Sequence, residues 1–223
     1  MSSSLAVSGA VKAYVQKWGM RGDPVLARCR AETAADPRSM MQISPEQGAF
    51  MQVLVKALRA RRALEVGVFT GYSSTAVAMA MKAMHGADTR LVACDISAEF
   101  VGRARGYWRA ADVDDVIETR VGPARESLEA LVSEGAGGSF DLMFIDADKT
   151  GYEAYYDLGL QLMRPGGMML IDNMLWSGAV ADPSDTSADT VALRRLAEKI
   201  HADERVDMTL ATVGDGLSMI AKR

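Results

Sequence analysis

Short apolar runs alternate with amphipathic helical stretches from Ala63 to the last quarter of the chain. Parallel strands need a long crossover connection, which is usually a helix, so this alternation indicates βαβ units and a parallel sheet. The crossovers are right-handed, which leaves few topologies. We expect strands at 63–68, 89–96, 115–122, 140–147 and 167–173, with helices near 73–84, 98–112, 124–134 and 151–163. The pattern predicts an α/β fold, a mostly parallel Rossmann-like sheet with helices on both faces.

The two ends of the chain depart from this alternation. A helix near 188–203 is followed by apolar runs at 206–213 and 217–223, which an Asp-Gly turn separates. Such a turn indicates a hairpin, so the sheet is expected to include a C-terminal antiparallel strand. Before the first strand we expect two helices within 4–36, a loop at 37–45 and a helix at 45–62. We expect a single domain over 1–223, in which residues 1–62 form N-terminal helices that cover the site and residues 63–223 form the α/β core.

Composition and charge exclude several classes of function. A chain of 223 residues is long enough for one good core. The formal net charge of −4 offers no basic field for nucleic acid, so a nucleic-acid partner is not expected. Two cysteines, Cys29 and Cys94, make no disulfide framework, and a reducing cytoplasm is the natural location. No secretory signal precedes the helices and no apolar stretch is long enough to span a bilayer, so no membrane partner is expected.

Acidic and amide side chains follow two neighbouring apolar strands. Asp146 follows the strand LMFI, and Asp172 and Asn173 follow the strand MMLI. Ligands of open α/β sheets bind beyond the carboxyl ends of the strands, so these three side chains should meet at one point. Three oxygen ligands suit Mg²⁺ or Ca²⁺ better than zinc. The alternative for each acid is a helix or turn cap. Lys149, three residues after Asp146, places a candidate base beside the metal.

A glycine-containing turn ends the first strand. Gly67 and Gly71 allow the backbone to turn tightly and approach a ligand, but their GxxxG spacing differs from the GxGxxG of dinucleotide binders. Glu65 at the strand end disfavours an anionic ligand and suits a cationic amino group. A purely structural tight turn is the alternative.

The second and third strands end in features that suit an adenosine. Asp95 closes the second strand, where an acid accepts hydrogen bonds from both ribose hydroxyls. The alternative is that Asp95 caps the helix that begins near residue 97. Gly122, Pro123 and Ala124 are small residues at the end of the third strand, where they leave room for a flat ring.

The motifs LEVGVFTGYS, ACDIS, FIDADK and DNMLWSG occur in this order, after a Met-Gln-Ile stretch at 41–43. In these motifs the chain resembles the cation-dependent class I O-methyltransferases, the family that includes caffeoyl-CoA and catechol O-methyltransferases, over nearly its whole length. The resemblance implies S-adenosylmethionine as methyl donor, a seven-stranded class I methyltransferase fold and a homodimer. The implied contacts to the donor are Met41, Ile43, Glu65, Gly67, Val68, Ser73, Asp95, Ala124, Asp148 and Tyr155.

The resemblance also implies how the reaction proceeds. It places a divalent cation, Mg²⁺ or another such as Ca²⁺ or Mn²⁺, on Asp146, Asp172 and Asn173. A phenol stays protonated near neutral pH, and a cation on its oxygen favours the phenolate. Lys149 matches the general base of the family. Methyl transfer to that oxygen then needs mainly proximity and alignment.

These observations predict an S-adenosylmethionine-dependent, divalent-metal-dependent O-methyltransferase that acts on a hydroxyl of a catechol-type small molecule. Methylation of a hydroxylated tRNA uridine and of a caffeoyl-CoA-type ester are alternatives within the same chemistry. The acidity of the chain disfavours the tRNA alternative. A non-catalytic cofactor-binding scaffold and a nicotinamide dehydrogenase are alternatives from other classes. The complete set of acids with Lys149 disfavours the scaffold, and the missing GxGxxG disfavours the dehydrogenase.

Overall fold

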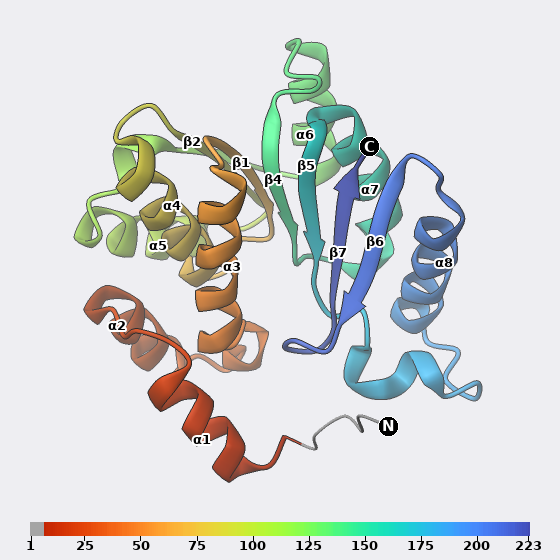
Figure 1. Ribbon diagram of the computed structural model, residues 1–223, viewed down its shortest axis with the longest axis horizontal. Coiled ribbons are helices and arrows are strands. Elements are labelled where there is room, and N and C mark those ends of the chain that lie inside the picture. The colour runs from red at the N-terminus through yellow and green to blue at the C-terminus, as the bar shows by residue number, and fades with distance from the viewer. Residues whose placement is uncertain (1–6) are drawn as a thin grey trace.

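The computed structural model describes residues 7–223, and its centre is a seven-stranded sheet in the order β3-β2-β1-β4-β5-β7-β6. Six strands run parallel to one another, and β7 is antiparallel to both of its neighbours, β5 and β6 (Figure 1). This confirms the predicted Rossmann-like sheet with one C-terminal antiparallel strand. The strands are β1 (Arg62–Val66), β2 (Arg90–Asp95), β3 (Ile117–Val121), β4 (Phe140–Ile145), β5 (Met163–Ile171), β6 (Val206–Ala211) and β7 (Leu217–Lys222).

Within residues 7–223, eight α-helices connect and cover the strands, close to the predicted ranges. Four short 3₁₀ segments lie between them: η1 (Ser39–Met41), η2 (Asp114–Val116), η3 (Lys149–Gly151) and η4 (Trp176–Ala181). The α-helices are α1 (Gly9–Trp18), α2 (Pro24–Thr33), α3 (Pro45–Leu58), α4 (Tyr72–His85), α5 (Ala98–Ala110), α6 (Ala124–Ser133), α7 (Tyr152–Leu162) and α8 (Ala188–Ala202). The predicted start of the first helix at residues 4–6 lies outside the described residues. None of the helices within 7–223 has the length and apolar character that crossing a membrane requires.

Local sequence explains where the N-terminal helices begin. Asp23 accepts hydrogen bonds from the backbone N–H groups of Val25 and Leu26, and Pro24 occupies the first turn, where no N–H is needed. Ser44 caps α3 in the same way, followed by Pro45. The helix predicted to reach residue 62 ends at Leu58 instead, because the next residue adopts the left-handed conformation and ends the helix.

The two faces of the sheet are covered by different helices. Along β1, Ala63 packs into the apolar cluster formed with α2, α3, α4 and α5, whereas Leu64 and Val66 pack into the cluster formed with α6, α7 and α8. Alternation of side chains along a strand produces this division. Burial on both faces is why the strands read as apolar runs rather than as alternating polar and apolar residues.

Strand β5 is longer than its sequence predicts. It was expected to begin at Gly167, but it begins at Met163, which pairs with Phe140 of β4 before an irregularity in the register. The intervening Pro165 and Gly166 are unfavourable within a strand, and they fall at this irregularity. Lys222 of β7 donates hydrogen bonds to the carbonyl oxygens of Leu160 and Met163 and so fixes the start of β5.

The strand order reverses direction between β1 and β4, which creates the crevice where ligands of such sheets bind. At this point the chain leaves β1 through Gly67, whose backbone has φ +93°. A Cβ atom on Gly67 would overlap the carbonyl oxygen of Asp146 at the end of β4. The close approach of the two strand ends therefore depends on a residue without a side chain.

We expect Gly67→Ala to destabilise the fold, because both the backbone conformation and the contact with Asp146 exclude a side chain. The backbone strain alone should cost about 1–3 kcal/mol, and the steric overlap adds to it. Gly102→Ala is the matched control, since this α5 position is open and Ala is worth up to about 1 kcal/mol more than Gly in a helix. Urea unfolding measures both changes. Equal midpoints for Gly67→Ala and the wild type would contradict this interpretation.

Candidate active site

The ends of β1, β4 and β5 bring two acidic residues together. Asp146 donates its backbone N–H to the carbonyl of Val66, and Asp172 donates to the carbonyl of Ile145, at 2.8 and 3.0 Å. The hydrogen-bond ladder between the strands thus continues one residue past β4 and past β5, and it brings both acids to the same edge of the sheet. The predicted convergence of Asp146 and Asp172 is therefore present in the backbone itself.

Both carboxyl groups are in surroundings that disfavour a negative charge. Burial, the larger cause, and the neighbouring carboxylate of Asp146 together raise the pKa of Asp172 to about 7. Burial also raises the pKa of Asp146. Hydrogen bonds hold Asp172 in place, since its Oδ1 accepts from the N–H of Asn173 at 2.7 Å and its Oδ2 accepts from Gln47 Nε2 at 2.8 Å. The two acids form a site that a positive charge would stabilise.

Asn173, the third predicted ligand, follows directly and adopts a left-handed backbone with φ 60°. Asn tolerates this conformation better than most residues. No group of three or more His, Cys, Asp or Glu side chains within residues 7–223 is arranged to hold a metal ion. The predicted ligand set combines two carboxylates with one amide and so has a different composition.

Lys149 lies beside the two acids rather than in solvent, with only 8% of its side chain exposed. Its Nζ lies 3.2 Å from Asp146 Oδ1, 2.9 Å from the carbonyl oxygen of Ala147 and 2.6 Å from the hydroxyl of Tyr152. The ring centroid of Trp176 lies 5.5 Å from the same nitrogen. Lys149 is thus a buried amine enclosed by acids and aromatic rings.

Glu65 is buried with an unsatisfied oxygen. Ser73 donates a hydrogen bond to its Oε1, whereas Oε2 has no hydrogen-bond partner among the described residues. Burial raises the pKa of Glu65 to about 8. Buried polar atoms nearly always have a partner, so an unsatisfied carboxylate oxygen at a ligand crevice indicates a donor that arrives with a ligand. A cationic amino group supplies such a donor.

Asp95 has a role that its sequence position did not reveal. Its Oδ2 accepts hydrogen bonds from the N–H groups of Val68 and Phe69, at 2.8 and 2.9 Å, and its Oδ1 accepts from the N–H of Ser97. The cap of α5 is Ser97, whose hydroxyl accepts from Phe100. Asp95 thus ties the turn after β1 to the end of β2, instead of capping the helix itself.

The remaining predicted donor contacts lie at several points around the carboxyl ends of the strands. Tyr155 donates a 2.6 Å hydrogen bond to the exposed Asp148, and Ala124 is the first residue of α6. Ile43 is buried, whereas Met41 on η1 has 52% of its surface exposed. No hydrogen bond within the described residues joins these five positions to Glu65 or Asp95.

Two residues near the acids were not predicted. Gln47 reaches Asp172 from the first turn of α3, and Tyr152 holds Lys149 from the first turn of α7. Tyr152 stands three residues after Lys149, one helical turn away, and this spacing was a usable signal. Gln47 is 125 residues from its partner in sequence, and no local pattern indicates such a contact.

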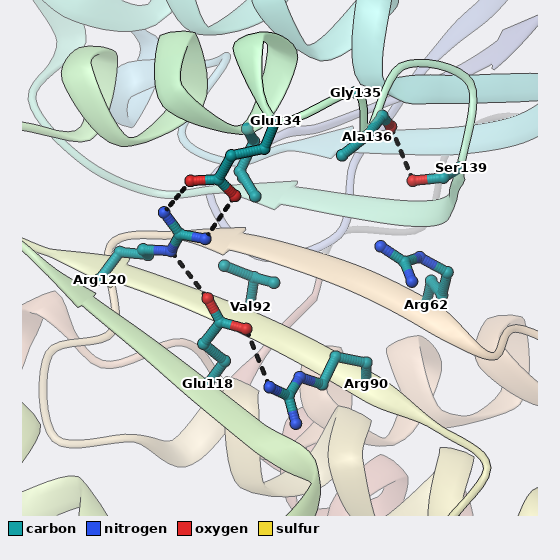
Figure 2. Close-up of a pocket in the computed structure, with 10 residues that line it drawn as sticks. Arg62, Arg90, Val92, Glu118, Arg120, Glu134, Gly135, Ala136 and Ser139 are labelled. Carbon is teal, nitrogen blue, oxygen red and sulfur yellow. Dashed lines mark hydrogen bonds and ion pairs between the residues drawn. The ribbon is translucent and has the colours of Figure 1, made fainter.

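One cavity lies away from these residues. It has a volume of about 410 Å³ and is lined by charged side chains from the amino-terminal ends of β1 and β2 and from β3 and α6. Figure 2 shows that these charges mostly satisfy one another: Arg120 contacts both Glu118 and Glu134, and Glu118 also binds Arg90. Arg62 and Arg90 of this cavity lie at the amino-terminal ends of β1 and β2, whereas Asp146 follows the carboxyl end of β4. Because its charged side chains mostly pair with one another, the cavity is not a candidate for the catalytic site.

Comparison with known proteins agrees with the geometry. The sequence profile of a family described as O-methyltransferase matches residues 17–223. A probable caffeoyl-CoA O-methyltransferase 2 of Dictyostelium discoideum is 42% identical over 83% of this chain and 79% of its own length. The catechol O-methyltransferase domain-containing protein 1 of Mus musculus is 35% identical over 94% of this chain and 78% of its own length.

Solved structures are similar over almost the whole chain. An O-methyltransferase from Bacillus cereus in complex with SAH superposes with a TM-score of 0.87 at 33% identity, covering 96% of this chain and 97% of that one. TomG from Streptomyces achromogenes in complex with SAM gives 0.85 at 30% identity and covers 96% of each chain. The chain therefore belongs to the O-methyltransferase family, and the protein is an O-methyltransferase related to the caffeoyl-CoA and catechol enzymes.

Proposed function

We propose that this enzyme transfers a methyl group from S-adenosylmethionine to a hydroxyl of a catechol-type small molecule, with a divalent cation at Asp146, Asp172 and Asn173. One observation carries the proposal. The buried Asp172, the partly buried Asp146 and the buried Lys149 meet at the β1–β4 switch point, next to a buried glutamate, Glu65, one oxygen of which lacks a hydrogen-bond partner among the described residues. The residues around Glu65 fit the methyl donor, and the acids with Lys149 fit the metal and the methyl acceptor.

The donor half consists of the turn after β1 and the residues around it. S-Adenosylmethionine carries a cationic amino group, for which Glu65 Oε2 is an acceptor without a competing partner among the described residues. Gly67 and Val68 present backbone without bulky obstruction, and Asp95 holds that backbone in place. We assign the remaining predicted contacts to the same donor: Met41, Ile43, Ser73, Ala124, Asp148 and Tyr155.

The metal half fits a hard cation on chemical grounds. Carboxylate and amide oxygens are the ligands that Mg²⁺, Ca²⁺ and Mn²⁺ prefer, and Mg²⁺ is commonly held by only one or two carboxylates. Two carboxyl groups whose pKa values are raised by burial, and in Asp172 also by the charge of Asp146, gain stability when a cation binds. Gln47 holds one of them, Asp172, from the side of α3.

The residues of the chain then have distinct roles in methyl transfer. S-Adenosylmethionine supplies an activated methyl group, and a divalent cation supplies charge that favours an ionised hydroxyl. Lys149 is placed to accept the proton of the acceptor hydroxyl, and Tyr152 and the carbonyl of Ala147 fix the direction of its amine. Trp176 covers the amine and limits the access of water. Alignment of the two substrates accounts for the remainder of the rate.

Several wider proposals rest on the family resemblance. A catechol-type acceptor is favoured over a tRNA by the net charge of −4. A cytoplasmic location agrees with two cysteines that are both buried and free. A homodimer agrees with α1, which has no buried residue and exposes Tyr14 and Trp18.

Donor binding should depend on the ionisation of Glu65. A carboxyl with a pKa of about 8 is mostly protonated at neutral pH, whereas the donor requires the ionised form. Affinity for S-adenosylmethionine is therefore expected to rise as the pH rises from 6 to 8, and calorimetry measures it. Glu65→Gln should weaken binding by roughly 10- to 100-fold and remove this rise, since a hydrogen bond to a charged group is worth about 1.5–3 kcal/mol. Glu198→Gln, an exposed α8 position, is the control. Equal affinities for the Glu65 variant and the wild type would exclude the assignment.

Turnover of a catechol should require a divalent cation. Chelation is expected to abolish methylation, and added Mg²⁺ should restore it, because the acids Asp146 and Asp172 would otherwise repel each other beside the acceptor oxygens. Asp172→Asn should weaken Mg²⁺ binding measured by calorimetry without loss of fold, since an amide keeps a similar shape. Full turnover in the chelated wild-type enzyme would refute the metal assignment.

Lys149→Ala should lower catechol turnover by roughly 100- to 10,000-fold, the usual loss when a general base is removed. Donor affinity should stay unchanged, because Lys149 contacts the acid and aromatic side of the site. The exposed Lys56→Ala is the control. Rates are measured from pH 6 to 10, and the variant should recover only where alkali ionises the catechol. Near wild-type turnover at neutral pH would remove Lys149 from the mechanism.

A further inference from the structure

The guanidinium of Arg194 on α8 binds four backbone carbonyl oxygens of one segment. Nε donates to Val180 at 2.9 Å, Nη1 to Asp185 at 2.8 Å, and Nη2 to Ala179 at 2.9 Å and also to Asp182. All three nitrogens are therefore used, and every acceptor belongs to residues 179–185. Arginine suits this role because its donors form a rigid planar array.

Besides Arg194, the second half of the segment from Trp176 to Asp185 is held by its own turn hydrogen bonds and by Val180, which packs against the apolar cluster of α6, α7 and α8. Its η4 portion contains no buried residue, and Ser177 and Gly178 both adopt left-handed conformations. Its first half is tied to the β6–β7 turn, where the carboxylate of Asp215 accepts the N–H of Ser177 at 2.7 Å. Arg194 supplies the hydrogen bonds that join the backbone carbonyls of the second half to α8, so the shape of the segment depends in part on Arg194.

The same segment leads directly out of the active site. It begins three residues after Asn173, and its first residue, Trp176, places its ring 5.5 Å from Lys149 Nζ. A change in the path of residues 179–185 is therefore transmitted to the wall next to the amine.

We infer that Arg194 is a positioning residue for the methyl acceptor, which fixes the 176–185 segment as a wall of the acceptor pocket. Arg194 touches no reacting atom and acts through backbone carbonyls alone. This inference rests on the proposed function, because it assumes that the acceptor lies beside Lys149. It gives α8, which packs beside the edge strand β6, a role in selecting the acceptor.

Three variants separate this role from a general surface charge. Arg194→Ala removes the array, Arg194→Lys keeps the charge but reaches few of the carbonyls, and Arg195→Ala removes the adjacent exposed arginine as a control. Hydrogen exchange by mass spectrometry reports on residues 176–187 without any assay of activity. Steady-state kinetics with a catechol and calorimetry with S-adenosylmethionine report on the two substrates.

Both Arg194 variants should exchange amide hydrogens in residues 176–187 about tenfold faster or more, because local opening requires less free energy. The KM for catechol should rise about tenfold, with kcat and donor affinity within about threefold of the wild type, as for lost acceptor binding. Arg195→Ala should match the wild type throughout.

Unchanged exchange in Arg194→Ala would overturn the inference, as would wild-type behaviour of Arg194→Lys or faster exchange with an unaltered KM. A wild-type enzyme that binds S-adenosylmethionine but methylates no catechol would instead contradict the proposed function. The exchange measurement would still decide whether Arg194 fixes the segment.

Discussion

The close approach of three strand ends is the constraint on which the site depends. The approach of β1 to β4 requires a glycine at position 67, and the convergence buries Glu65 and Asp172 beside the partly buried Asp146. Burial of like charges is unfavourable, as the raised pKa values of all three carboxyl groups indicate. Lys149 and Gln47 offset part of this cost. Cationic ligands would offset the rest, so the same electrostatics that destabilise the isolated protein favour the binding of positively charged ligands.

The residues on the two sides of the switch point between β1 and β4 have different surroundings. Glu65, with its unsatisfied oxygen, belongs to β1 and is bonded by Ser73 of α4, whereas residues that follow β4 and β5 surround Lys149. A donor and an acceptor held on opposite sides would meet at the boundary between them. Little covalent chemistry is then required of the protein, and positioning becomes its main contribution.

Much of this could be predicted from sequence because the decisive residues stand at strand ends. Periodicity predicted the strands, and the acids that followed them predicted the converging edge. The contacts that were not predicted are of a different kind. Gln47 meets Asp172 across 125 residues, Asp95 holds a turn through its backbone N–H groups, and Arg194 binds carbonyls that carry no side-chain signature. Each depends on how distant elements pack, which local pattern does not encode.

The position of β7 has a consequence for how the chain folds during its synthesis. It lies between β5 and β6, although it follows both in sequence, so β6 has no sheet partner until β7 has emerged. Until then, the open hydrogen-bonding edge of β5 is available to other chains. The edge of β5 is therefore exposed on the ribosome while the chain from residue 171 to residue 217 is being synthesised. Chaperone binding or the speed of translation over this stretch would influence the yield of folded enzyme.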